Sequence, residues 1–260
     1  MQSVTASADL EWLRRGAGRA PLVVAHRGAS GQAPENTLAA FRLAIQQGAP
    51  AVECDVHLTL DGVPVVIHDD RVDRTTTGTG EVATQRYDAL RDLDAGTWFC
   101  AQFAGEHLPT LEEALAVCAG KARLIVELKR GGGEALVDAA LAAINRAPGT
   151  DLAVISFGPE EVRHVARKRP DLALGFLIGR KHLQEHGAAT AVGAAQNFGA
   201  NFISPQYDAT DETLVRLAVD AGLPVSVWTV DDPGRMRRLA AMGVNAITTN
   251  YPDVALDLFR

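Results

Sequence analysis

Short apolar runs alternate along this chain with longer segments in which apolar residues recur every three or four positions. The short runs predict buried strands, and the longer segments predict amphipathic helices. Eight runs qualify as strands, at residues 22–26, 51–57, 123–129, 153–157, 173–178, 202–205, 224–230 and 245–248. Between them, helices are predicted at residues 37–47, 111–118, 134–145, 159–168, 190–198, 211–220 and 234–242.

This order of strands and helices indicates an α/β protein with a parallel sheet. Pro159 suits the first turn of a helix, and Gly48, Gly199 and Gly243 suit helix ends, so these boundaries agree with the apolar pattern. Eight strand–helix units favour closure into a (β/α)8 TIM barrel over an open sheet. We therefore expect a TIM barrel.

One stretch, residues 58–110, interrupts the alternation after the second predicted strand. It contains Asp-Gly at 61–62, which is a turn signal, and then a short apolar run at residues 63–69. The connection is too short for a parallel crossover, so this run is predicted to return as an antiparallel hairpin strand. The rest of the stretch, rich in Thr, Gly and Asp, is expected to form a small cap inserted over the barrel mouth.

Chain length limits the number of domains. A chain of 260 residues with 47% apolar residues can bury one large core, and TIM barrels commonly have about 250 residues. We expect residues 1–260 to form a single catalytic barrel domain that contains the insertion at approximately residues 58–110.

Acidic residues lie on one face of the second and third predicted barrel strands. Side chains alternate across a strand, so Glu53 and Asp55 share the face opposite their apolar neighbours, and Glu127 follows the same rule. The apolar face belongs against the helices, which directs the carboxylates into the barrel, where they repel one another unless a proton or cation lies between them. Oxygen ligands favour one divalent cation, Mg²⁺ or Ca²⁺. The alternative is a buried ion-pair network around Lys129.

Two histidines are predicted close to these acids. His26 ends the first predicted strand, and the hairpin turn returns His68 to the level of Glu53. One strand-end histidine is more often a packing residue, but two beside one cation predict a base and an acid that act across a phosphorus atom. Arg27 and Lys129 would supply positive charge for the phosphate oxygens. Which histidine is the base stays open.

Three further residues are candidates for substrate binding. Glu35 and Asn36 precede the first predicted helix. Either the segment is a loop in which Asn36 caps that helix, or both residues reach the pocket rim. Trp228 lies near the end of a predicted strand and either packs in the core or forms an aromatic wall for an alcohol. His57 shares the carboxylate face but lies further out, so we expect it in the pocket wall or behind the ligands.

Composition and charge exclude several kinds of partner. The formal net charge is −7 and basic residues form no cluster, which argues against nucleic acid. No run approaches the roughly 20 apolar residues of a membrane span, and the first 20 residues lack a secretory signal pattern.

The three cysteines lack metal-binding spacing and suit free thiols. We expect a cytoplasmic protein that binds a small-molecule phosphodiester without stable membrane anchoring. Its oligomeric state is not indicated.

A series of motifs covers most of the chain, from Val23 to Pro252. In order they are His-Arg-Gly at 26–28, Pro-Glu-Asn-Thr at 34–37, Glu-Cys-Asp-Val-His at 53–57, Asp-Gly-Val-Pro-Val-Val-Ile-His-Asp at 61–69, Asp-Arg-Thr-Thr at 73–76, Leu-Pro-Thr-Leu-Glu-Glu at 108–113, Glu-Leu-Lys at 127–129 and Trp-Thr-Val at 228–230. Together they resemble the glycerophosphodiester phosphodiesterase family. Asn250 departs from the resemblance, because an acid is expected there, as a partner at the barrel rim rather than at the reacting centre.

The resemblance implies a phospholipase-C-like TIM barrel with a small insertion after the second strand. It implies metal binding by Glu53, Asp55 and Glu127, catalysis by His26 and His68, and phosphate contacts from Arg27 and Lys129. The implied reaction is the hydrolysis of a glycerophosphodiester, such as glycerophosphocholine or glycerophosphoethanolamine, to glycerol 3-phosphate and an alcohol.

Two other functions stay open from the sequence. A phosphodiesterase acting on lysophospholipid or sphingolipid head groups would need an apolar approach to the mouth, for which the insertion offers Tyr87, Trp98, Phe99 and Phe103. No basic amphipathic helix marks a membrane surface, which argues against it. A non-catalytic module that binds phosphorylated alcohols is the other possibility, but the intact acids and histidines argue against it.

Overall fold

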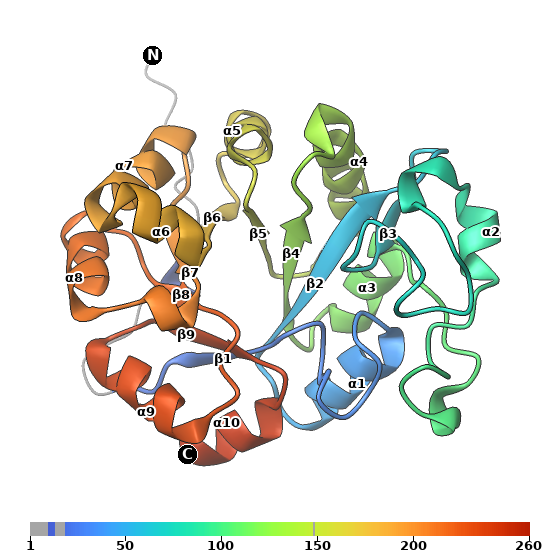
Figure 1. Cartoon of the computed structure of the whole chain (residues 1–260), viewed down its shortest axis with the longest axis horizontal. Helices are drawn as coiled ribbons and strands as arrows, with labels where there is room; N and C mark the ends of the chain where they lie inside the picture. The colour runs from blue at the N-terminus through green and yellow to red at the C-terminus, as the bar shows by residue number, and fades with distance from the viewer. Residues whose placement is uncertain (1–9, 14–18, 148) are drawn as a thin grey trace.

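Eight parallel strands form a barrel, which confirms the expected (β/α)8 TIM fold in the computed structural model of the chain (Figure 1). The structure describes residues 10–13, 19–147 and 149–260, so most of the first 20 residues, where no signal pattern is predicted, lie outside the described part. The strands are β1 (Leu22–Ala25), β2 (Ala51–Leu58), β4 (Arg123–Leu128), β5 (Leu152–Ser156), β6 (Ala173–Ile178), β7 (Phe202–Pro205), β8 (Ser226–Val227) and β9 (Ala246–Thr249). They are ordered β7-β6-β5-β4-β2-β1-β9-β8, and parallel bridges from Ile203 to Val225 and from Gln206 to Trp228 bring β7 beside β8.

Helices surround the ring of strands (Figure 1). Those that the apolar pattern predicts are α1 (Leu38–Gln46), α3 (Leu111–Cys118), α4 (Gly133–Arg146), α5 (Pro159–Lys168), α7 (Ala188–Phe198), α8 (Glu212–Asp220) and α9 (Pro233–Met242). The structure adds the shorter helices α2 (Tyr87–Arg91), α6 (Arg180–His186) and α10 (Pro252–Leu258). It also adds the 3-10 turns η1 (Glu11–Leu13), η2 (Val82–Thr84), η3 (Ala101–Phe103) and η4 (Tyr207–Ala209).

Alternation along the strands separates two apolar clusters. Outside the ring, Val52, Cys54 and Val56 of β2 are fully buried in the layer between the sheet and the helices. Inside the ring, a second cluster includes Leu13 of η1, which is only 1% exposed, and alanines at or near the amino ends of the strands, Ala51, Ala153, Ala173 and Ala246. This cluster extends up to the floor and wall of a pocket at the carboxyl end of the barrel, where TIM barrels place their chemistry and where the charged interior residues lie.

The insertion begins with the predicted hairpin. Strand β3 (Pro64–Val66) pairs antiparallel with β2, with Val65 opposite His57. The Ile67 amide then donates to the Asp55 carbonyl at 3.0 Å, so His68 returns to the level of the β2 carboxylates as expected.

The rest of the insertion has a small core of its own, made by Val65, Ile67, Val72, Val82, Leu90, Ala95 and Leu108. In Figure 1, α2 and its flanking loops lie beside β2 and α3, outside the ring of strands. The insertion contacts the loop after β1 through Arg74, which binds Asp69 of the insertion on one side and Glu35 of that loop on the other.

Candidate active site

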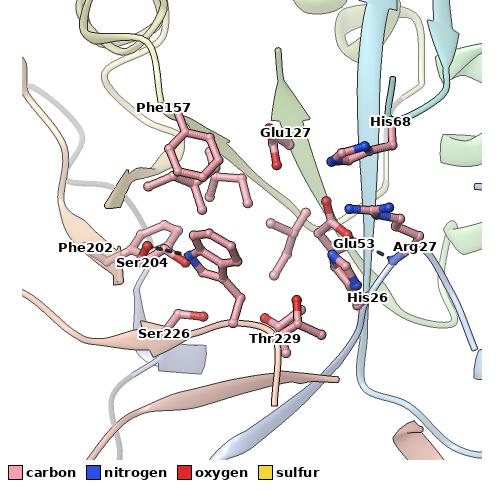
Figure 2. Close-up of a pocket in the computed structure, with 15 residues that line it drawn as sticks. His26, Arg27, Glu53, His68, Glu127, Phe157, Phe202, Ser204, Ser226 and Thr229 are labelled. Atoms are coloured by element: carbon pink, nitrogen blue, oxygen red, sulfur yellow. Dashed lines mark hydrogen bonds between the residues drawn. The ribbon is translucent and has the colours of Figure 1, made fainter. Parts of the chain in front are cut away.

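A pocket at the carboxyl ends of the strands has a charged wall and a neutral wall (Figure 2). The charged wall consists of His26, Arg27, Glu53, His68 and Glu127. The facing wall is aromatic and hydroxylic, and its members include Phe157, Phe202, Ser204, Ser226 and Thr229. Trp228, which contacts Phe157 and Ser204, belongs to the same wall. The structure therefore brings together both predicted histidines and two of the three predicted metal-binding acids in one cavity.

The loop after β1 turns sharply to present its side chains to this pocket. Arg27 adopts a φ of 53° and Gly28 a φ of 83°. A Cβ atom on Gly28 would lie 2.5 Å from the Ala40 carbonyl carbon, so only glycine fits between the loop and α1. The turn directs the Arg27 amide to Glu53 Oε2, to which it donates at 2.9 Å.

The three predicted metal-binding acids converge. One oxygen from each of Glu53, Asp55 and Glu127 lies within 4.8 Å of the others. Two cations also reach them: Lys129 Nζ lies 2.6 Å from Asp55 Oδ1 and 2.9 Å from Glu127 Oε1, and Arg27 Nε lies 3.1 Å from Asp55 Oδ2. The ion-pair network considered as an alternative is therefore present, but it sets two cations against three carboxylates.

The excess negative charge appears in the pKa values of the acids. Burial, together with the charges of Asp55 and Glu127, raises the pKa of Glu53 well above its usual range. Burial and the charge of Asp55 raise the pKa of Glu127 to about 7. Burial acts in the same direction on Asp55, but Lys129 and Arg27 outweigh it and hold the pKa of Asp55 far below its usual range.

These residues fit a hard divalent cation. All three acids are buried and offer oxygen ligands. Asp55 Oδ1 accepts no hydrogen bond of good geometry from the described residues, although Lys129 Nζ is close. A cation among the three carboxylates would remove the repulsion that raises the pKa values of Glu53 and Glu127.

His26 is fixed by the loop after β9. Its Nδ1 lies 2.7 Å from Asn250 Oδ1, while Asn250 Nδ2 donates to Asp231 Oδ2 at 2.7 Å. A carboxylate accepts only, so the Asn250 amide nitrogen must face Asp231 and its oxygen must face His26. His26 therefore carries its proton on Nδ1 and leaves Nε2 as an acceptor. Burial and the nearby Arg27 charge lower the pKa of His26 to about 4.

His68 is fixed by its neighbour in the insertion. Its Nδ1 donates to Asp69 Oδ1 at 2.7 Å, and its side chain is 36% exposed. Burial lowers the pKa of His68, and the nearby Asp55 and Asp69 carboxylates oppose that shift. The hydrogen bond from Arg74 is the main cause that holds the pKa of Asp69 well below its usual range, so Asp69 is ionised beside the imidazole.

Comparisons with known proteins agree with this geometry. The model of the glycerophosphoryl diester phosphodiesterase family matches residues 26–254. The chain belongs to this family. A glycerophosphodiester phosphodiesterase of Caldanaerobacter subterraneus subsp. tengcongensis is 36% identical over 245 residues, which cover 92% of this chain and 98% of that protein.

Solved structures of the family have the same fold. A phosphodiesterase of Oleispira antarctica, in complex with the product sn-glycerol 3-phosphate, superposes with a TM-score of 0.85 and 31% identity over 92% of this chain and 96% of that one. A glycerophosphodiester phosphodiesterase of Agrobacterium tumefaciens gives a TM-score of 0.78 and 30% identity over 91% and 99% of the two chains. The expected class, a phosphoric diester hydrolase of the glycerophosphodiester phosphodiesterase type, is confirmed. Among the described residues, no helix combines the length and apolarity needed to cross a bilayer.

The other residues predicted near the site lie at different depths relative to the pocket. Trp228 lines the pocket, donates from Nε1 to the Ser204 carbonyl at 2.8 Å, and packs edge-on against Phe157. Asn36 is buried and holds Asp55, with its Nδ2 2.8 Å from Asp55 Oδ2. His57 lies behind His68, with its Nε2 3.1 Å from the His68 carbonyl oxygen.

Glu35 accepts hydrogen bonds from two arginines. Its Oε1 accepts from Arg27 Nη1 at 2.8 Å and from Arg74 Nη2 at 2.8 Å, and its Oε2 accepts from Arg74 Nη1 at 3.0 Å. Burial opposes ionisation, but these hydrogen bonds lower the pKa of Glu35. In this structure Glu35 joins Arg27 to the insertion.

Four residues that contact the two histidines or their partners are absent from the predicted site. Asn250 was expected away from the reacting centre, and this is wrong, because it contacts His26 directly. Asp231 orients Asn250, and Asp69 and Arg74 support His68. The available signals were indirect: Asp69 and Arg74 lie within motifs that resemble the family.

Proposed function

We propose that this protein hydrolyses small glycerophosphodiesters, such as glycerophosphocholine or glycerophosphoethanolamine, to glycerol 3-phosphate and an alcohol. The observation that carries the proposal is a cluster of three buried carboxylates, two of which line one pocket together with two differently supported histidines. Family membership supports the reaction class. The sn-glycerol 3-phosphate in the Oleispira antarctica structure supports the product.

One divalent cation, Mg²⁺ or Ca²⁺, would be held by Glu53, Asp55 and Glu127. When bound, it supplies charge stabilisation for the phosphate oxygens in the transition state. Arg27 and Lys129 would add positive charge at the same place. Both side chains are largely buried, with 16% and 12% of their surface exposed, so their charges act with little screening by water.

His26 would act as the general base. Its Nδ1 proton is committed to Asn250, and its pKa of about 4 keeps Nε2 unprotonated at neutral pH. Nε2 can then remove a proton from the oxygen that attacks phosphorus. If that oxygen is water, glycerol 3-phosphate forms directly; if it is the 2-hydroxyl of the substrate, a cyclic phosphodiester forms first and water then opens it.

His68 would act as the general acid. The ionised Asp69 carboxylate on Nδ1 stabilises the imidazolium form, which the neutral amide beside His26 does not. The imidazolium donates its Nε2 proton to the departing alkoxide oxygen as the P–O bond breaks. The proton removed at His26 thus balances the proton delivered at His68.

The lipid-directed alternative receives less support. The aromatic side chains of the insertion pack on one another, since Phe99 contacts both Trp98 and Phe103 edge-on. Tyr87 is hydrogen-bonded within the insertion to the Leu108 carbonyl. The residues lining the pocket come from the barrel strands, the loops that directly follow them, and His68, so the substrate is expected to be a small molecule.

We further propose that residues 1–260 act as one catalytic domain, and that the protein is cytoplasmic. The cytoplasmic location is supported by three free cysteines, which suit a reducing compartment.

The test is turnover of glycerophosphocholine, glycerophosphoethanolamine and a long-chain lysophospholipid, with EDTA and after addition of Mg²⁺ or Ca²⁺. We expect EDTA to abolish turnover of the two small substrates and a divalent cation to restore it. Glu127→Gln should lose both turnover and cation binding, whereas Glu160→Gln on the exposed surface of α5 should change neither. Turnover that is insensitive to chelation, or confined to the lysophospholipid, would contradict the proposal.

A further inference from the structure

Arg74 of the insertion directs its whole guanidinium at two carboxylates, Asp69 of the insertion and Glu35 of the loop after β1. Its Nε donates to Asp69 Oδ2 at 2.6 Å, and its Nη1 donates to Glu35 Oε2 at 3.0 Å. Its Nη2 donates to both, at 2.8 Å to Glu35 Oε1 and 3.1 Å to Asp69 Oδ1. Every guanidinium nitrogen therefore faces a carboxylate, which leaves Arg74 poorly placed to bind substrate phosphate itself.

Each of the two carboxylates holds a residue of the charged wall. Asp69 Oδ1 accepts from His68 Nδ1 at 2.7 Å, and Glu35 Oε1 accepts from Arg27 Nη1 at 2.8 Å. A continuous chain of contacts thus runs from His68 through Arg74 to Arg27. It joins the insertion to the loop after β1.

We propose that Arg74 is a positioning residue that fixes the His68 imidazole through Asp69 and the Arg27 guanidinium through Glu35. The inference rests on the proposed roles of His68 as general acid and Arg27 as a phosphate ligand. The insertion would then have a specific role, which is to fix the distance between His68, which it carries, and Arg27 in the loop after β1.

Electrostatics and geometry both favour arginine at this position. Asp69 and Glu35 share contacts to the same Nη2 atom, so without Arg74 two carboxylates would face each other without a cation between them. The planar guanidinium serves two carboxylates at fixed angles, which the single ammonium group of lysine cannot do.

The effect is expected in activity rather than in global stability. Arg74 is 45% exposed and Asp69 is 30% exposed, so water screens these ion pairs and their contribution to folding is small. Catalysis is less tolerant, because a displacement of about 1 Å in a reacting group can cost on the order of 100-fold in rate.

The first experiment compares Arg74→Ala with Arg71→Ala. Arg71 is a matched control, because it is an equally exposed arginine of the same loop that pairs with Asp73 and Glu81 instead. We expect Arg74→Ala to lower kcat about 10- to 100-fold. We expect Arg71→Ala to remain within about twofold of the parent, and both variants to unfold within a few degrees of it. Equal kcat values for the two variants would overturn the proposal.

Three further readouts separate positioning from a purely structural role. Guanidinium ion at tens of millimolar should restore part of the kcat of Arg74→Ala, because the half-exposed site is open to it, and should not affect Arg71→Ala. Arg74→Lys, which keeps the charge, should recover less than half of the loss. Arg74→Ala combined with Asp69→Asn should cost little more than the larger single effect, since Arg74 acts on His68 through Asp69. Additive losses, or full activity in Arg74→Lys, would contradict a shared positioning role.

The same assays distinguish the two proposals. If the parent protein does not turn over glycerophosphodiesters, the proposed function fails. If the parent is active and His68→Ala is impaired while Arg74→Ala is not, only the role of Arg74 fails.

Discussion

The two histidines of the pocket are held by different parts of the molecule. On the barrel side, His26 is hydrogen-bonded to Asn250, and Asn250 is hydrogen-bonded to Asp231. These three residues lie in the loops that follow β1, β9 and β8, respectively. On the insertion side, His68 is hydrogen-bonded to Asp69, and Asp69 is hydrogen-bonded to Arg74. The group in direct contact with His26 is thus a neutral amide, whereas the group in direct contact with His68 is an ionised carboxylate.

This difference shows how one fold gives the same side chain two proton affinities. A neutral acceptor fixes a tautomer without stabilising a positive charge, whereas a carboxylate does both. The barrel side also belongs to the closed ring, while the insertion side is more exposed and rests on its own small core. We therefore expect the two sides to respond differently to substitution, acid and local loosening.

The largest expected effect comes from removing each histidine. His26→Ala and His68→Ala should each lower kcat about 10²- to 10⁴-fold, the usual contribution of a general acid or base. The comparison sharpens with a p-nitrophenyl ester of glycerol 3-phosphate, whose leaving group needs little protonation. His68→Ala should then lose less than about tenfold, while His26→Ala keeps its full loss.

These rate constants are measured on folded, cation-saturated protein, with His107→Ala as the control at an exposed position of the insertion. A leaving-group effect that appears in His26→Ala instead would reverse the two roles. Near-parental turnover in both variants would remove the histidines from the mechanism.

Acid should destabilise the barrel side more than the insertion side. The pKa of His26 is about 4 in the folded protein, below the ordinary histidine pKa of 6.5, because burial disfavours its charged form. The unfolded chain therefore binds the proton more readily, and stability that is present above pH 6.5 is lost as the pH falls toward 4. The pKa of His68 is lowered too, but its greater exposure should reduce the effect.

The measurement is urea unfolding of the metal-free parent, His26→Gln and His68→Gln at pH 7 and pH 4.5. We expect His26→Gln to lose clearly less stability on acidification than the parent, and His68→Gln to lose nearly as much as the parent. An identical pH response in the parent and His26→Gln would indicate that His26 is not protected from protonation.

The charged wall could be predicted from sequence where local rules apply. Alternation along β2 directs Glu53 and Asp55 inward, and the turn at residues 61–62 returns His68 to their level. Such patterns involve short stretches of chain, so the apolar residues between the polar ones report the direction of each side chain.

The supports of the histidines could not be predicted in the same way. His26 and Asn250 are 224 positions apart, and their contact depends on β1 and β9 lying next to each other in the closed ring. Arg74 lies in a loop without periodicity, so its direction follows from tertiary contacts with Asp69 and Glu35. The helices α6 and α10 were missed because each is only seven residues long.

A moderate effect is expected from loosening the insertion alone. Asp94 accepts hydrogen bonds from the amides of Gly96, Thr97 and Gly105 at 2.7–2.8 Å and so closes the loop of residues 94–105. Asp94→Ala should destabilise this loop by about 1–2 kcal/mol, since water replaces part of the lost bonding. Brief proteolysis should cut the variant within the insertion while the barrel fragments stay folded.

Asp88→Ala, at an exposed position of α2, is the control for that experiment. If Asp94→Ala instead lowered the main unfolding transition of the barrel by a comparable amount, the insertion and the barrel would unfold as one cooperative unit. The distinction between the two sides would then be one of chemistry and not of stability.

The smallest expected effect is a difference in thiol reactivity. Cys100 is exposed in the insertion, whereas Cys54 and Cys118 are buried in the barrel. Burial raises the pKa of Cys118 to about 12 and raises the pKa of Cys54 well above its usual range, so both stay protonated and unreactive at pH 8. A thiol reagent should label one cysteine rapidly in the folded protein and all three in urea.

Cys100→Ser should abolish the rapid phase, and labelled protein should keep its turnover within about twofold because Cys100 does not line the pocket. Rapid labelling of Cys54, which lies between Glu53 and Asp55 on β2, would mean that the barrel side opens as readily as the insertion.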